Sequence, residues 1–236
     1  MHTKWPERHA SLLRAATGRD RAAELRPRPT VVHLTYLDPG YLASGARRHD
    51  SWTSGDRHSL PPGYPLEIVL IVENRDSRLW FPPVPGAVVV ENNGSAAARH
   101  IPEIPWILKA PVVVYWGDID QEGFTILDSL RYELRRRGTV LHSMLMDQPT
   151  FVRYERFGVA HDKDGKTIPG RARPLRNLTP DERPAYEQVS TGGDARVRRI
   201  EQENIPLVEA QETLLGTLPV WRRRGTECAV VGLPDS

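Results

Sequence analysis

Hydrophobic runs that end in acidic residues recur along the chain, and the clearest lies at Ala110 to Gly123, which reads APVVVYWGDIDQEG. The β-branched and aromatic residues from Val112 to Trp116 are typical of a short strand that is buried on both faces of a sheet. Apolar residues then recur at helical spacing, which predicts a helix over 121–137. The stretch therefore predicts a strand, an acidic turn and a helix in succession.

The same reasoning predicts elements on both sides of this stretch. Strands are predicted at 30–37, 67–72, 87–90 and 139–146, and helices or helical turns at 1–28, 75–80, 95–99, 104–108, 150–157, from 179 onward and at 206–215, with a loop over 38–64. Alternating strands and helices predict an α/β fold with a mostly parallel sheet and helices on both faces. We divide the chain into an N-terminal helix, strand and loop extension (1–62), a core (63–150) and a mostly helical C-terminal flank (151–236).

Three acidic residues follow the predicted strands. Asp118 and Asp120 are two positions apart, so in an extended chain both carboxylates point to one side. Glu73 ends the strand at 67–72, and an open α/β sheet binds its ligands at the carboxyl ends of its strands. Carboxylates held together repel one another, and a hard cation such as Mg²⁺, or Mn²⁺, offsets that repulsion. The pattern predicts a three-carboxylate metal site, although Asp-x-Asp alone is also found at solvated strand ends.

Further residues near these acids are candidates for metal or phosphate binding. Glu122 stands at a third alternating position and could hold a second metal, or it could be a solvated acid at the start of a helix. The helix that begins near Gly123 directs backbone N–H groups toward the same place, which suits a phosphate, and Asn74 follows Glu73. We therefore predict Asn74 and Gly123 as phosphate-binding residues.

At these residues the sequence resembles the Toprim domain of topoisomerases, primases and related nucleases, which has a Glu after its first strand and Asp-x-Asp after its third. Further strings resemble the JetD family, the nuclease subunits of bacterial Wadjet anti-plasmid systems, over about 31–215: LIVEN (70–74), IPWI (104–107), YWGDID..GF.IL (115–127), SMLMD (143–147), LT..E (178–182) and RIEQE (199–203). The resemblance implies a Toprim-like fold and a Mg²⁺-dependent DNA endonuclease. Its metal ligands would be Glu73, Asp118 and Asp120, with Glu73 also able to act as a base or to position water.

The resemblance also implies partners. These are double-stranded plasmid DNA, a second copy of the chain in a homodimer, and an SMC-type ATPase complex that delivers the DNA. JetD relatives carry an N-terminal arm and a winged-helix region, for which about 60 residues before the core are too few; we expect either a C-terminal piece of a longer chain or a separate winged-helix DNA-binding chain. Relatives often have a His where Glu122 stands and a Gly-rich turn where Glu91, Asn92 and Asn93 stand.

Three other functions compete with the nuclease. A haloacid-dehalogenase-type phosphatase also has Asp-x-Asp after a buried strand, but it expects Gly-Thr next, where Gln121 and Glu122 stand. A topoisomerase needs a nucleophilic Tyr, and we interpret Tyr115, Tyr132 and Tyr154 as packing residues. A Toprim-like dimerisation module that does not cut DNA would have no use for three buried acids, which cost stability.

Composition narrows the function less than the motifs do. The formal charge of +2 over 236 residues gives no general argument for nucleic-acid binding. The single Cys228 excludes a disulfide framework and fits a cytoplasmic protein, and neither a membrane span nor a secretion signal is predicted. His33, His49 and His58 lack metal-ligand spacing and are interpreted as loop or surface residues, and HDKDGK at 161–166 as a turn rather than a calcium loop.

Overall fold

The computed structural model describes residues 11–12, 15, 31–53, 63–92, 100–191 and 196–230, with side chains as far as 219. The chain divides into two compact units, Met1–Thr30 and Val31–Ser236, and the fold described below is that of the second. The predicted helix at 95–99, nearly all of that at 1–28, and His58 lie outside the described residues.

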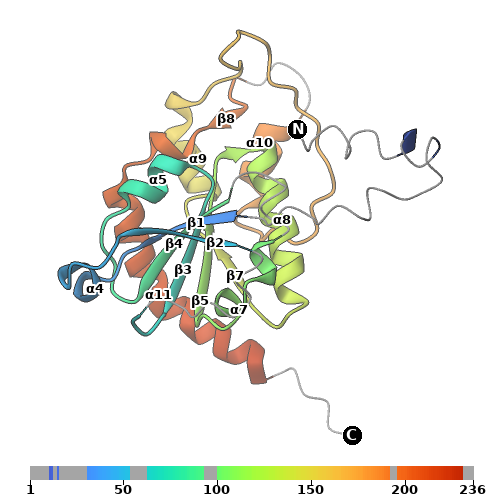
Figure 1. Ribbon diagram of the computed structural model, residues 1–236. Coiled ribbons are helices and arrows are strands. Elements are labelled where there is room, and N and C mark those ends of the chain that lie inside the picture. The colour runs from blue at the N-terminus through green and yellow to red at the C-terminus, as the bar shows by residue number, and fades with distance from the viewer. Residues whose placement is uncertain are drawn as a thin grey trace, which may run out of the picture. The chain divides into compact units, whose positions relative to one another are not determined.

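A six-stranded sheet forms the centre of the second unit (Figure 1). Its strand order is β2-β1-β4-β3-β5-β7, with bounds β1 Val31–Tyr36, β2 His49–Thr53, β3 Ile68–Val72, β4 Ala87–Glu91, β5 Val112–Trp116 and β7 Leu141–Ser143. The four strands from β4 to β7 in this order pair in parallel, whereas β1 pairs antiparallel with β4 and β2 antiparallel with β1. Every residue of β3, β4 and β5 is buried, as expected for central strands covered on both faces. The predicted mostly parallel α/β fold is confirmed.

Two crossovers leave the middle of the sheet in opposite directions. Strand β3 connects through helix α5 (Arg75–Trp80) to β4 on one side, and β5 connects through α8 (Gln121–Arg135) to β7 on the other. Since such crossovers are right-handed, α5 and α8 must cover opposite faces, and Figure 1 shows them on opposite sides of the strands. The neighbouring carboxyl ends of β3 and β5 are therefore the point where the topology switches, which is where open α/β sheets bind ligands.

The connection from β4 to β5 runs past β3 through the short helical segments η1 (Ile101–Glu103) and α7 (Pro105–Leu108). Residues of η1 contact α8, so this connection covers the same face as α8. The predicted apolar turn at 104–108 corresponds to α7. The predicted strand at 139–146 is shorter in the structure, because only the three residues of β7 pair with β5.

The region 38–64 is not simply a loop, and this prediction was wrong. It contains helix α4 (Pro39–Ala43), capped by the Asp38 side chain, and strand β2. The sequence of β2, HDSWT, has one buried apolar residue, Trp52, so it lacks the alternation that marks a strand; pairing with β1 supplies the structure. His33 and His49 lie on β1 and β2 at exposed positions, which agrees with the surface interpretation.

Residues after β7 form a mostly helical flank, as predicted. It comprises α9 (Gln148–Tyr154), η2 (Glu155–Phe157), α10 (Arg183–Ser190), strand β8 (Arg199–Ile200), η3 (Gln202–Asn204) and α11 (Leu207–Val230). Helix α11 extends well past the predicted end at 215 and continues through Pro219. The HDKDGK segment is a turn closed by a bridge between His161 and Thr167.

The outer segments of the predicted three-part division share sheet contacts with the core. β1 and β2 extend the central sheet, and β8 of the flank pairs with the short strand β6 (Ile119–Asp120). The division itself remains a prediction. In the part of the chain that the structure describes, no helix is both long enough and apolar enough to cross a membrane.

Candidate active site

The three predicted carboxylates lie where the topology switches. Glu73 follows β3, and Asp118 follows β5 after Gly117. The last residues of the two strands, Val72 and Trp116, pair with each other, so the acids that follow them emerge from adjacent strand ends. Asp120 ends β6 and directly precedes α8.

Glu73 is held by a tyrosine from the neighbouring strand. Its Oε1 accepts a hydrogen bond from the hydroxyl of Tyr115, which also lies 3.3 Å from the carbonyl oxygen of Gly123. We predicted Tyr115 as a packing residue; it is fully buried, and its hydroxyl in addition orients Glu73. Oε2 of Glu73 makes no hydrogen bond to any described residue, so it is available to a ligand.

Asp118 is anchored by the flank. Its Oδ1 accepts a hydrogen bond of 2.8 Å from the backbone N–H of Gln202 at the start of η3. The Gln202 side chain reaches the other strand end, because its Oε1 accepts 3.0 Å from the backbone N–H of Asn74. Gln202 thus ties the ends of β3 and β5 together and leaves Oδ2 of Asp118 without a hydrogen-bond partner among the described residues.

Asp120 has both carboxylate oxygens bonded to the protein. Oδ1 caps α8 by accepting 2.8 Å from the backbone N–H of Gly123, and Oδ2 accepts 2.7 Å from Nε of Arg199. The side chain of Asp120 is only 6% exposed, whereas that of Arg199 is 31% exposed, so the ion pair is buried on the Asp120 side and open to water on the Arg199 side. A carboxylate oxygen has two lone pairs, so these bonds do not in themselves prevent it from binding a metal.

Two glycines leave the space that the carboxylates occupy. A Cβ on Gly117 would collide with Oε1 of Glu73 and with the ring of Tyr115. A Cβ on Gly123 would collide with the carbonyl oxygen of Asp118 and come within 3.1 Å of Oε1 of Glu73. Glu73 therefore lies against both the end of β5 and the first turn of α8.

The remaining predicted site residues have other contacts in this structure. The Asn74 side chain caps α5 by accepting 2.8 Å from the N–H of Ser77, and its Nδ2 donates to Oε1 of Glu203. The N–H of Gly123 is used by Asp120. Glu122 is exposed on the first turn of α8. Phosphate binding by Asn74 and Gly123 and metal binding by Glu122 stay predictions.

Burial and mutual repulsion perturb two of the acids. Burial, together with the charges of Asp118, Asp120 and Glu122, raises the pKa of Glu73 to about 8, although the Tyr115 hydrogen bond acts against this shift. Burial, Asp120 and Glu203 raise the pKa of Asp118 to about 6, against the opposing effects of the Gln202 N–H and Arg199. The anionic forms of Glu73 and Asp118 are therefore destabilised by burial and by neighbouring negative charges, and a bound cation would stabilise them.

The donors suit a hard divalent cation but do not yet surround one. Carboxylate oxygens are the ligands of Mg²⁺ and Mn²⁺, and Glu73 and Asp118 each have an oxygen free of hydrogen bonds to described residues. Within the described residues, however, no three His, Cys, Asp or Glu side chains are already grouped as metal ligands. Each acid instead accepts hydrogen bonds from protein partners at one or both of its carboxylate oxygens.

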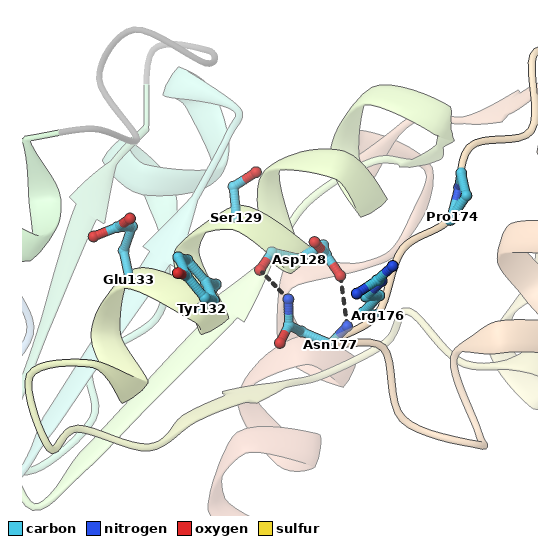
Figure 2. Close-up of a pocket in the computed structure, with 7 residues that line it drawn as sticks. All are labelled: Asp128, Ser129, Tyr132, Glu133, Pro174, Arg176 and Asn177. Atoms are coloured by element: carbon cyan, nitrogen blue, oxygen red, sulfur yellow. Dashed lines mark hydrogen bonds between the residues drawn. The ribbon is translucent and has the colours of Figure 1, made fainter.

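A surface pocket of about 360 Å³ lies elsewhere, between α8 and the segment 174–177 (Figure 2). Two of its lining residues bond to each other: the Asp128 side chain accepts 2.7 Å from the N–H of Asn177, and the Asp128 carbonyl oxygen accepts 3.4 Å from Nδ2 of Asn177. None of the predicted site residues lines it. We interpret this pocket as part of the contact between α8 and the flank.

One family of known proteins matches most of the chain. The family model described as Wadjet protein JetD, C-terminal, matches residues 24–214, which is most of the chain. The chain belongs to this JetD C-terminal family. Comparison with the curated proteins finds no match. The JetD match covers both the central sheet and the flank that supplies Gln202 and Arg199.

The sequence did not indicate that three residues outside the predicted site, Tyr115, Arg199 and Gln202, would contact its acids. Gln202 and Arg199 belong to the string RIEQE, which supported the family resemblance without a function, and Tyr115 was assigned to packing. The string RIEQE lies among other charged and polar residues, so its composition did not distinguish it from a solvated segment. Its place about 80 residues after Asp120 gave no indication that it would contact the site.

The raised pKa of Glu73 predicts an unusual pH dependence of stability. Because the folded-state pKa of about 8 exceeds the ordinary 4.5, the protonated form favours folding, and this stabilisation is lost as pH rises from about 5 to 8. We expect Tm of the metal-free protein to fall over this range, by on the order of 10 °C, relative to Glu73→Gln. Calorimetry at several pH values measures this difference, and parallel curves for the two proteins would contradict it. Metal affinity should rise up to about tenfold per pH unit over the same range.

Proposed function

We propose that this chain is a Mg²⁺-dependent DNA endonuclease subunit with a Toprim-like site at the carboxyl ends of β3 and β5. The observation that carries the proposal is that Glu73 and Asp118 follow adjacent parallel strand ends at the topological switch point, with Asp120 at the start of α8, in a chain of the JetD C-terminal family. Mg²⁺ held by these three residues, with Mn²⁺ as a substitute, would neutralise phosphate charge and supply an activated water.

The protein residues would do the following. Glu73 would position a metal-bound water or accept a proton from it through Oε2, since only Oε1 is used by the Tyr115 hydroxyl. Tyr115 orients that carboxylate, and the backbone of Gln202 orients Asp118. Asp120 fixes the first turn of α8 against the same site. The acids are thus positioned from four separate segments, and the flank is needed to complete the site.

A non-cleaving dimerisation or assembly module is the alternative. Such a module would gain nothing from the three acids, because their burial and repulsion raise the pKa of two of them and cost stability. A metal-binding function explains why the acids are kept together. The phosphatase and topoisomerase alternatives have no comparable support among the contacts of this site.

The test is a metal titration on closed circular plasmid. Full-length chain should nick or linearise plasmid with Mg²⁺ or Mn²⁺, and chelation with EDTA should abolish cleavage. A homodimer, the state we propose because two sites could cut both strands, would show twice the chain mass in light scattering. Absence of cleavage with either metal, both alone and with an ATP-driven DNA-translocating partner of the SMC type, would contradict the nuclease proposal.

The rate of DNA cleavage should depend more on delivery of the DNA by a partner than on the base sequence of the DNA. Carboxylates and phosphate contacts read no base sequence, and a formal charge of +2 gives little general attraction to DNA. We therefore expect the chain alone to bind DNA weakly and in a salt-sensitive way and to cut slowly with no sequence preference, and an SMC-type ATPase complex with ATP to accelerate cleavage. Efficient, sequence-specific cutting of short linear duplex by the chain alone would show that the delivery part of the proposal is wrong.

A further inference from the structure

Arg199 lies directly opposite Asp120 at the predicted metal site. Strand β8 pairs antiparallel with β6 in a register that sets Asp120 against Arg199 and Ile119 against Ile200. Directly opposite residues of an antiparallel pair have their side chains on the same face. The pairing therefore brings a cation from the flank, about 80 positions away in sequence, to the first turn of α8.

The hydrogen bond to Asp120 orients the guanidinium and leaves most of its donors unused. Nε of Arg199 donates 2.7 Å to Oδ2 of Asp120, and neither Nη1 nor Nη2 has a hydrogen-bond partner among the described residues. The side chain remains 31% exposed, whereas that of Asp120 is 6% exposed. Arg199 therefore presents a fixed pair of N–H donors to solvent beside the acids.

The neighbouring Arg198 shows the contrasting, structural use of an arginine. Arg198 is 3% exposed, and its Nη1 donates to the backbone carbonyl oxygens of Val189, at 3.1 Å, and Thr191 at the end of α10. Its guanidinium is buried against the flank. Of the two adjacent arginines, one stabilises the flank and the other faces the acids.

We infer that Arg199 binds a non-bridging oxygen of the DNA phosphodiester at this site, an assignment that rests on the proposed nuclease function. A planar guanidinium presents parallel N–H donors that match phosphate oxygens, and its orientation by Asp120 reduces the entropy lost on binding. A fixed cation is also what the substrate needs here, because three carboxylates would otherwise repel a phosphate. Asp120 has a second role in this arrangement, as the residue that positions Arg199.

The test measures DNA binding without cleavage. A fluorescent short linear duplex is titrated with full chain in Ca²⁺ at several salt concentrations, comparing wild type with Arg199→Gln, Arg199→Lys and Arg136→Gln. Arg136 is the matched control, because it is 62% exposed and lies at the other end of α8, roughly 20 Å away along the helix axis. Tm of each variant checks that it is folded, and calorimetry measures Ca²⁺ affinity without DNA.

Arg199→Gln is expected to weaken duplex binding about tenfold and to reduce the slope of log K against log salt by about 0.9, the loss of one phosphate contact. Arg199→Lys should keep the slope with weaker binding, Arg136→Gln should match wild type, and Ca²⁺ affinity should not fall in Arg199→Gln. An unchanged slope in Arg199→Gln, or a loss of Ca²⁺ affinity that accounts for the weaker binding, overturns the assignment. Wild type that binds no duplex at low salt also overturns the assignment, whereas the nuclease proposal is decided separately by the plasmid-cleavage test.

Discussion

Asp118→Asn is expected to reduce metal-dependent plasmid cleavage by about 10³-fold or more, because it removes a charged ligand that supplies several kcal/mol of stabilisation to the reaction. The fold should be kept, since an Asn Oδ1 can still accept the hydrogen bond from the Gln202 backbone. Burial and the charges of Asp120 and Glu203 raise the pKa of Asp118 to about 6, so neutralising it should leave Tm at neutral pH equal to or above that of wild type. Cleavage assays and calorimetry on the same samples measure both effects.

The variant Asp120→Asn is compared with Asp118→Asn in the same two assays. It should also abolish cleavage, but it breaks the ion pair with the partly exposed Arg199, so its Tm should lie below that of Asp118→Asn. A variant with Asp118 replaced that still nicks plasmid at the wild-type rate with Mg²⁺ would remove Asp118 from the site. Equal Tm values for the two variants would instead show that the Arg199 pair contributes little to stability.

Arg131→Met is expected to destabilise the protein by about 3–5 kcal/mol, the usual cost of removing one partner of a buried ion pair. Arg131 on α8 donates two 2.7 Å hydrogen bonds to the two carboxylate oxygens of Glu182, whose side chain is 3% exposed. Glu182 also accepts from Ser143 and from the N–H of Thr179. Although burial raises the pKa of Glu182, these partners lower it below its ordinary value, so its charged form is well stabilised and would lose its main partner.

The matched control is Arg137→Met, because Arg137 forms a 2.7 Å ion pair with Glu133 on the surface of the same helix region, where both side chains are more than one third exposed. Its loss should change the free energy of unfolding by less than about 1 kcal/mol. Urea denaturation gives both values, and the double variant Arg131→Met with Glu182→Leu should recover part of the loss. An Arg131→Met protein within 1 kcal/mol of wild type would show that the pair contributes little to holding the flank against α8.

The pattern of apolar and polar residues along the chain was sufficient to predict the central strands and the positions of the acids that follow them. Strands β3, β4 and β5 are continuous apolar runs because both faces are covered, and such runs are visible without tertiary contacts. Glu73, Asp118 and Asp120 could be identified because each follows its strand or turn within two residues, so local sequence places them. The alternation of strands and helices likewise predicted the sheet's mostly parallel character.

Only the tertiary structure decided where strand β2 forms and which residues surround those acids. Strand β2 forms because β1 offers it a pairing edge, although its own sequence has a single buried apolar residue. Arg199 and Gln202 reach the site because β8 pairs with β6 and η3 meets the end of β5, contacts between segments about 80 residues apart. The energies of such contacts depend on burial and on which donors meet which acceptors, and neither is encoded in the spacing of residues along the chain. The sequence by itself therefore determined which acids follow the central strands, and the packing of the flank determined which residues contact them.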